Sequence, residues 1–259
     1  MADLSSIRGF LCDLDGVLYV GRNVIDGARA AITEIKRRGY RCRFITNTST
    51  LSRASLHDKL TGLGFDIAGH EIISAPQAAL IHLRQLGDPV CHWVLSEDVK
   101  QDFRHLRQAD DKADVVVIGD IGEAWSYSLL NKVFNLLMNG AELIAIHKNR
   151  FWQTEHGLQM DIGAFVSALE YASRKQATVI GKPSPAFFRA ALSEMDLPPE
   201  NVAIIGDDVD SDIGGGQTAG LTGILVKTGK YRKAYVDDSP IVPDLTIASI
   251  ADLPGHLPG

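Results

Sequence analysis

The chain has 259 residues, of which 45% are hydrophobic and 22% charged, and its formal net charge is -6. This length can bury a sizeable core in one large or two modest domains, and the absence of a basic tail or stripe argues against nucleic acid as the main partner. No apolar run approaches the roughly 20 residues of a membrane span, and residues 1–4 lack the basic and apolar stretches of a signal peptide. Three widely spaced cysteines (Cys12, Cys42 and Cys91) signal neither a disulfide framework nor a zinc site. We therefore expect a soluble, cytoplasmic protein.

The first predicted element is a buried strand at residues 9–12, and it runs directly into a pair of aspartates, Asp13 and Asp15. Leu14 between them should turn back into the core. Two carboxylates this close repel each other unless a cation or a shared proton relieves them, and open α/β sheets keep their ligands at the carboxyl ends of strands. The pair indicates a metal site, an acid/base pair or both, although a strand that runs into an Asp/Gly turn would also explain it.

Strands and helices alternate along the rest of the chain. The predicted helices span residues 28–38, 51–63, 128–138 and 164–173, with Ser52 as a cap. The predicted strands span residues 41–45, 93–95, 115–118, 143–146, 178–180, 202–205 and 223–226. Fully apolar strands such as residues 202–205 suit a parallel sheet that is covered on both faces. Residues 18–25 predict a small hairpin or flap, and residues 237–243 a polar surface loop.

The middle of the chain forms a second α/β set that lies between the polar motifs of the two outer segments. We therefore predict an α/β fold with a Rossmann-like parallel-sheet core made by residues 1–78 and 179–259. An α/β domain would be inserted into this core at residues 79–178.

Two further polar clusters follow predicted strands. Thr46 and Asn47 could hold a phosphoryl oxygen through a hydroxyl and an amide, although a turn followed by a helix cap explains them equally well. Lys182 lies in the stretch Gly-Lys-Pro-Ser-Pro at residues 181–185, where Ser184 and the proline after it form a good helix start. Lys182 could be a fixed cation at the end of a strand, but a lone lysine near a turn is usually a solvated surface charge.

A third cluster, Gly-Asp-Asp-Val-Asp-Ser-Asp at residues 206–212, places four acids in six residues after a strand. Oxygen-only ligands favour a hard ion such as Mg²⁺, and the spacing does not match a calcium-binding EF-hand loop. We assign Asp208 and Asp210 mainly to helix N-terminal charge. The glycines at residues 214–216 are better explained by close packing of a helix on the sheet than by phosphate binding.

Each cluster alone is only suggestive, but their order along the chain resembles the four motifs of the haloacid dehalogenase-like hydrolases. The matching residues are Asp13 and Asp15, Thr46 with Asn47, Lys182, and Gly206-Asp207 with Asp212. The interval between Thr46 and Lys182 resembles subfamily IIA, in which a large α/β cap domain lies between the second and third motifs. Residues 144–150 and 225–231 look most similar to the phospholysine phosphohistidine inorganic pyrophosphate phosphatase branch.

The resemblance implies a Mg²⁺-dependent phosphatase that hydrolyses small phosphorylated substrates. Asp13 would attack phosphorus and become an aspartyl phosphate, a known use of carboxylate nucleophiles. Asp15 would protonate the leaving oxygen and then deprotonate the hydrolytic water. Thr46 and Asn47 would position the phosphoryl oxygens.

The resemblance also implies the metal ligands. Mg²⁺ would be held by Asp13, by the main-chain carbonyl of Asp15 and by Asp207, with Asp212 mostly behind these ligands. Lys182 and Mg²⁺ together would offset the charge of the acids and of the incoming phosphate, so that the work is chiefly positioning and electrostatics.

The basic stretch at residues 147–150 follows the predicted strand 143–146, where a loop of the inserted domain could face the active site. One interpretation is that His147 and Asn149 contact the leaving group of the substrate, while Lys148 or Arg150 adds a field that attracts anions. The alternative is a solvated basic turn with His147 at the surface.

Several functions share parts of this pattern. A haloacid dehalogenase would need neither Asp15 as an acid nor Asp207 as a metal ligand, and a phosphotransferase or mutase would share the core but keep water out. A receiver-type phospho-switch would leave the inserted domain unexplained, and a regulatory protein with a dead site would normally have lost a catalytic group. The sequence leaves open the physiological substrate and the bond cleaved, and a homodimer is possible.

Overall fold

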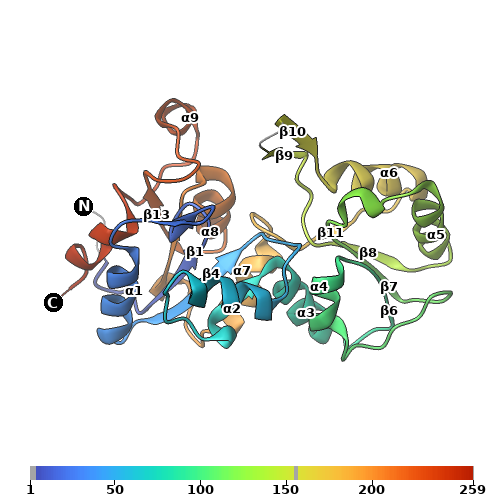
Figure 1. The fold of residues 1–259 in the computed structure, drawn as a ribbon, viewed down its shortest axis with the longest axis horizontal. Helices are drawn as coiled ribbons and strands as arrows, with labels where there is room; N and C mark the ends of the chain where they lie inside the picture. Colours follow the sequence, from blue (N-terminus) through green and yellow to red (C-terminus); the bar gives the residue numbers. More distant parts are fainter. Residues whose placement is uncertain (1–3, 155–156, 259) are drawn as a thin grey trace. The chain divides into compact units, whose positions relative to one another are not determined.

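In the computed structural model, which describes residues 4–154 and 157–258, the chain folds as two units (Figure 1). The described parts of residues 1–46, 56–73 and 182–259 form the first unit, and those of residues 47–55 and 74–181 form the second. The insertion that we predict spans residues 79–178, whereas the middle part of the second unit begins at residue 74 and ends at residue 181.

A six-stranded sheet with the order β14-β13-β12-β1-β4-β5 forms the centre of the first unit. The strands are β1 (Gly9–Asp13), β4 (Arg41–Thr46), β5 (Ile72–Ser74), β12 (Val202–Gly206), β13 (Thr222–Val226) and β14 (Leu245–Ile247). From β14 to β4, each strand runs parallel to its neighbour. Every residue of β1 and β12 is buried, as expected for central strands of a sheet covered on both faces. The predicted parallel-sheet core is therefore confirmed.

Helices accompany this sheet. They are α1 (Ala28–Arg37), α2 (Arg53–Gly62), α7 (Pro185–Ser193), α8 (Gly215–Thr218) and α9 (Lys233–Asp238). The helix α2 begins after Ser52, whose hydroxyl oxygen accepts a hydrogen bond from Ser55 N at 3.2 Å, so Ser52 is the predicted cap. The first residues of α2 cluster with the second unit and its later turns with the first. The predicted hairpin is formed by β2 (Tyr19–Val20) and β3 (Asn23–Val24).

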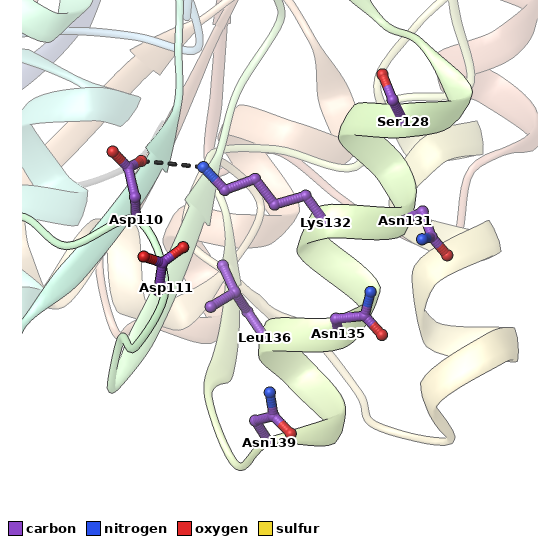
Figure 2. A pocket seen from close by; sticks show the side chains of 8 residues that line it. All are labelled: Asp110, Asp111, Ser128, Asn131, Lys132, Asn135, Leu136 and Asn139. Carbon is purple, nitrogen blue, oxygen red and sulfur yellow. Dashed lines mark hydrogen bonds and ion pairs between the residues drawn. The ribbon is translucent and has the colours of Figure 1, made fainter.

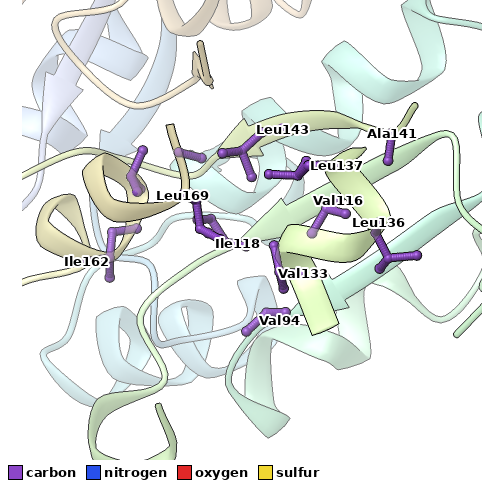
Figure 3. Packing of buried hydrophobic residues seen from close by; sticks show 12 residues of the cluster. Val94, Val116, Ile118, Val133, Leu136, Leu137, Ala141, Leu143, Ile162 and Leu169 are labelled. Carbon is purple, nitrogen blue, oxygen red and sulfur yellow. The ribbon is translucent and has the colours of Figure 1, made fainter. Parts of the chain in front are cut away.

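The second unit has its own parallel sheet with the order β11-β8-β7-β6. Its strands are β6 (Cys91–Val94), β7 (Val115–Ile118), β8 (Glu142–Ala145) and β11 (Thr178–Val179), and β9 (Phe151–Thr154) pairs with β10 (Gly157–Met160) as a hairpin. Its helices are α3 (Ala75–Gln85), α4 (Glu97–Phe103), α5 (Tyr127–Met138) and α6 (Gly163–Ser173). Side chains from β6 and β7, including Val94, Val116 and Ile118, pack with α5 and α6 in one buried apolar cluster (Figure 3).

The sequence did not predict the helices α3, α4 and α9, the strands β5 and β14, or the pair β9 and β10. The helices α3 and α4 each begin after a serine cap, because Ser74 accepts a hydrogen bond from Gln77 N and Ser96 accepts one from Val99 N. The strands β5 and β14 have three residues each, too few to show a period. The loop prediction for residues 237–243 is wrong at its start, because α9 continues to Asp238.

Helices of the two described ranges lack the combination of length and apolar character that a membrane crossing requires.

Candidate active site

Four charged side chains of the first unit meet at the carboxyl end of its sheet. Asp13 is the last residue of β1, and Asp207 follows β12 directly. These strands are parallel neighbours, with Cys12 opposite Ile205, so both acids leave the sheet at the same edge. Lys182 precedes α7, and Asp212 lies in a short π-helical turn, Val209–Gly214. All four side chains are buried.

Lys182 joins two of the acids. Its ammonium nitrogen lies 2.5 Å from Asp13 Oδ1 and 2.7 Å from Asp212 Oδ1. Burial lowers the pKa of Lys182, but the charges of Asp13 and Asp212 outweigh that effect and the net shift is upward. Lys182 is therefore a buried cation, and the solvated surface lysine of the alternative interpretation is wrong.

The acids carry more negative charge than Lys182 can offset. The pKa of Asp13 is raised to about 8, chiefly by burial; Lys182 opposes this rise, and Asp212 and Asp207 add to it. Burial also raises the pKa of Asp207 to about 6, with Asp212 adding to the rise. Asp13 and Asp207 are close together and both are hard to ionise, so a second positive charge at this site would stabilise their ionised forms.

One oxygen each from Asp13, Asp207 and Asp212 lie within 4.8 Å of one another. A set of carboxylate oxygens whose negative charge is only partly offset by Lys182 fits a hard divalent cation such as Mg²⁺. The sequence prediction placed Asp212 behind the ligands, whereas the structure groups its carboxylate with those of Asp13 and Asp207. The side chain of Asp15 is exposed, and the predicted ligand at that position is a main-chain carbonyl.

Two glycines shape the space around Asp207, and sequence reasoning did not assign them to the site. A Cβ added to either Gly16 or Gly229 would overlap the Asp207 carboxylate, and both glycines have positive φ angles, of +92° and +57°. Lys230 N donates a hydrogen bond to Asp207 Oδ2 at 2.7 Å, and the Thr228 hydroxyl donates one to Gly16 O. In the sequence, Gly16 follows the Asp13 and Asp15 motif, and Gly229 lies in the stretch 225–231, so each glycine stands in or beside a motif.

The remaining acids of the 206–212 cluster have structural roles. Asp208 caps the π-helical turn, because its Oδ1 accepts hydrogen bonds from Asp210 N at 3.1 Å and Ser211 N at 3.0 Å. Asp210 is exposed and accepts a hydrogen bond from the Tyr235 hydroxyl. A cavity of about 210 Å³ lies beside this loop. It is lined by Asp207, Asp208, Val209, Asp210, Lys230, Tyr231, Arg232, Tyr235 and Val236.

The glycines after this loop pack closely, as predicted. A Cβ on Gly216 would overlap Ile204 of β12, and a Cβ on Gly215 would lie 2.7 Å from Phe188. Larger residues would therefore push α8 away from its neighbours.

The two residues of the predicted phosphate-binding pair, Thr46 and Asn47, belong to different units. Thr46 is the buried last residue of β4, one residue beyond Ile45, which lies opposite Asp13 in the sheet register. Asn47 is the first residue of the segment 47–55, which clusters with the second unit.

The two predicted leaving-group contacts lie in the second unit and differ in environment. His147 is only 4% exposed, and its Nε2 lies 2.9 Å from Ser49 Oγ, so the solvated-turn interpretation is wrong for this residue. Burial lowers the pKa of His147 below its usual value. Lys148 forms an ion pair with Glu170 at 2.5 Å, whereas Asn149 is exposed.

A second cavity, of about 340 Å³, lies entirely in the second unit (Figure 2). Asp110 and Asp111 line it opposite the polar face of α5, and Lys132 reaches across to pair with Asp110 at 3.0 Å. None of the predicted site residues lines this cavity.

Comparison with known proteins agrees with the geometry of the first unit. A family model described as haloacid dehalogenase-like hydrolase matches residues 10–119, and one described as HAD-hydrolase-like matches residues 179–253. Haloacid dehalogenase-like hydrolase domain-containing protein 2 from Bos taurus is 39% identical, over 99% of this chain and 98% of that protein. Phospholysine phosphohistidine inorganic pyrophosphate phosphatase from Bos taurus is 36% identical, over 96% of this chain and 93% of that protein. The solved p-nitrophenyl phosphatase from Archaeoglobus fulgidus superposes with a TM-score of 0.90 at 26% identity, over 97% of this chain and 99% of that one.

Proposed function

Because this chain belongs to the haloacid dehalogenase-like hydrolases and is a phosphatase of that family, we propose that it hydrolyses small phosphorylated substrates with Mg²⁺ through an aspartyl phosphate. The observation that carries the proposal is the buried cluster in which Lys182 bridges Asp13 and Asp212 beside Asp207. Such a cluster can hold a nucleophile, a cation and an incoming dianion in one place.

In the proposed reaction, Asp13 attacks phosphorus through one carboxylate oxygen. The other oxygen of Asp13, together with Asp207 and the main-chain carbonyl of Asp15, would hold Mg²⁺, and Asp212 would support them. The metal would supply positive charge that draws the phosphate to the acids and stabilises the charge of the transition state. The ion pairs of Lys182 keep its ammonium fixed beside Asp13, where it adds a second positive charge without having to move.

Asp15 is proposed to donate a proton to the leaving oxygen and then to take one from the water that hydrolyses the phosphoenzyme. Its exposure suits a group that must exchange protons with solvent. Thr46 and Asn47 are proposed to orient the phosphoryl oxygens, and Asn149 to contact the leaving group. A cytoplasmic location and a homodimer stay predictions.

The test is a phosphate-release assay with p-nitrophenyl phosphate, pyrophosphate, phospholysine and phosphohistidine, the last three following the name of the Bos taurus relative. We expect turnover with Mg²⁺, none with a chelator, and poor rescue by Ca²⁺, which prefers looser coordination. Asp207→Ala should sharply raise the Mg²⁺ concentration needed for half-maximal rate. Full turnover without metal would contradict the mechanism and favour dehalogenase-like chemistry. A phosphorylated acceptor in place of free phosphate would identify a phosphotransferase.

A further inference from the structure

Two residues of the second unit are joined covalently to proposed active-site residues. Asn47 follows Thr46, and Gly181 precedes Lys182, so the chain passes between the units at both points. Whatever holds Asn47 and Gly181 in place therefore limits how far Thr46 and Lys182 can shift.

The residue after β8, Ile146, holds Gly181, and Asn47 lies close to Gly181. Gly181 N donates a hydrogen bond to Ile146 O at 2.7 Å. A Cβ added to Gly181 would lie 2.8 Å from Ile146 O, 2.9 Å from Asn47 Oδ1 and 3.2 Å from His147 Cβ. Gly181 is therefore packed against both Asn47 and His147, with no room for a larger side chain at position 181.

His147 adds a directional bond to this packing. Asn149 N donates a hydrogen bond to His147 Nδ1 at 3.4 Å, which makes Nδ1 an acceptor. The neutral ring must then carry its proton on Nε2, which donates to Ser49 Oγ at 2.9 Å. Burial lowers the pKa of His147, so the neutral form persists at neutral pH. The ring orientation is thus set on both sides.

The rest of the segment 47–55 is anchored as firmly. The Ser96 hydroxyl donates to Thr50 O at 3.0 Å, and Asp98 Oδ2 accepts from Ser52 N at 2.7 Å. Asp102 Oδ2 accepts from Arg53 N at 2.8 Å. These contacts come from α4 and from the residue that caps it, so the segment is built into the second unit.

We propose that His147 is a positioning residue, which acts through Ser49 and Gly181 to fix the two chain segments that continue into Thr46 and Lys182. The inference rests on the proposed function, and it replaces direct contact between His147 and the leaving group. A displacement of about 1 Å at a catalytic group can cost on the order of a hundredfold in rate, so a residue of this kind can matter without touching substrate.

The test compares His147→Ala, His147→Gln, Ser49→Ala and the double alanine variant on p-nitrophenyl phosphate and phenyl phosphate. We expect His147→Ala to lower kcat about 10- to 100-fold, and equally on both substrates, because the phosphoryl group is the same. His147→Gln should keep most of the activity, since its amide N–H can reach Ser49. The kcat of the double variant should be no lower than that of His147→Ala, because both substitutions break the same hydrogen bond, from His147 to Ser49.

His92→Ala is the matched control. His92 is also a buried histidine of the second unit, with its Nδ1 3.2 Å from Ala109 O, and it has no part in the site. It should lower the melting temperature about as much as His147→Ala and leave kcat unchanged. Equal kcat losses in the two variants would reduce His147 to a structural role and overturn the proposal.

Three other results would also overturn it: no loss in His147→Ala, a loss that depends on the leaving group, or losses that add in the double variant. The affinity for inorganic phosphate in Mg²⁺, measured by calorimetry, gives a readout that does not need turnover. It should fall at least about tenfold in His147→Ala but not in His92→Ala. If the wild-type protein released no phosphate from any substrate, the proposed function would fail, and this affinity would still decide the positioning role.

Discussion

The ammonium of Lys182 lies between the carboxylates of Asp13 and Asp212, 2.5 Å from one and 2.7 Å from the other. One cation is thus shared by two buried acids, while a third acid, Asp207, adds further negative charge. Stability and chemistry both depend on the charges that meet at this point.

Replacement of the nucleophile should separate activity from folding. Asp13→Asn keeps the size of the side chain and removes a charge whose pKa is raised by burial, so the melting temperature should not fall. Turnover should fall on the order of a thousandfold or more, as for other catalytic nucleophiles. Phosphate release and a thermal melt check the two parts. Asp210→Asn, an exposed acid of the neighbouring loop, is the control and should stay active, whereas activity retained by Asp13→Asn would remove Asp13 from this role.

Loss of the shared cation should damage both properties. Lys182→Met leaves Asp13 and Asp212 buried without their partner, and breaking a buried ion pair in this way costs about 3–5 kcal/mol. Mg²⁺ should raise the melting temperature more in this variant than in the wild type, because the metal then replaces the positive charge that Lys182 supplied. Lys230→Met, whose side chain is 74% exposed and pairs with Asp208 at 3.5 Å, should show both effects much more weakly. A Lys182→Met protein as stable as the wild type would contradict the shared-cation description.

The stability of the metal-free protein should depend on pH in a defined direction. In the folded state the pKa of Asp13 is about 8 and that of Asp207 about 6, whereas an unfolded aspartate titrates near 3.9. The folded state therefore binds more protons between these values, and its stability falls as pH rises from about 4 to about 8. Mg²⁺ should remove this penalty, so its effect on the melting temperature should be larger at pH 8 than at pH 5. Asp13→Asn should flatten the metal-free profile, and a profile that rises with pH in both proteins would refute the assignment.

The glycines around Asp207 should be needed for metal binding. Gly16→Ala should displace the Asp207 carboxylate and raise the Mg²⁺ requirement for turnover at least tenfold, about the size of other losses caused by displaced ligand supports. Gly39→Ala is the matched control, because its φ of +85° is close to the +92° of Gly16 and nothing lies within 4 Å of the added Cβ. Both variants should lose about 1–2 kcal/mol through backbone strain. Equal Mg²⁺ requirements in the two would show that the close approach to Asp207 is unimportant.

Much of the first unit follows from short stretches of sequence. Apolar runs predict β1 and β12, and the acids that follow them predict polar strand ends, because both signals lie within a few consecutive residues. The cap role of Asp208 and the close packing of Gly216 are local as well. The helices α3 and α4 were not predicted although serine caps precede them; in α4 only Val99 and Phe103 are buried, too few to show a helical period.

Which charges share a site depends on the tertiary fold. The sequence predicts that Asp13, Lys182 and Asp207 stand at the ends of strands or turns, but it could not show that Lys182 bonds both Asp13 and Asp212, residues far apart along the chain. It also could not show that Gly16 and Gly229 enclose Asp207, or that the segment after Thr46 is built into the second unit through Ser49 and His147. The physical reason is that strand ends are encoded by neighbouring residues, whereas contacts between them depend on the order in which parallel strands pair, and that order is set by the packing of the whole sheet.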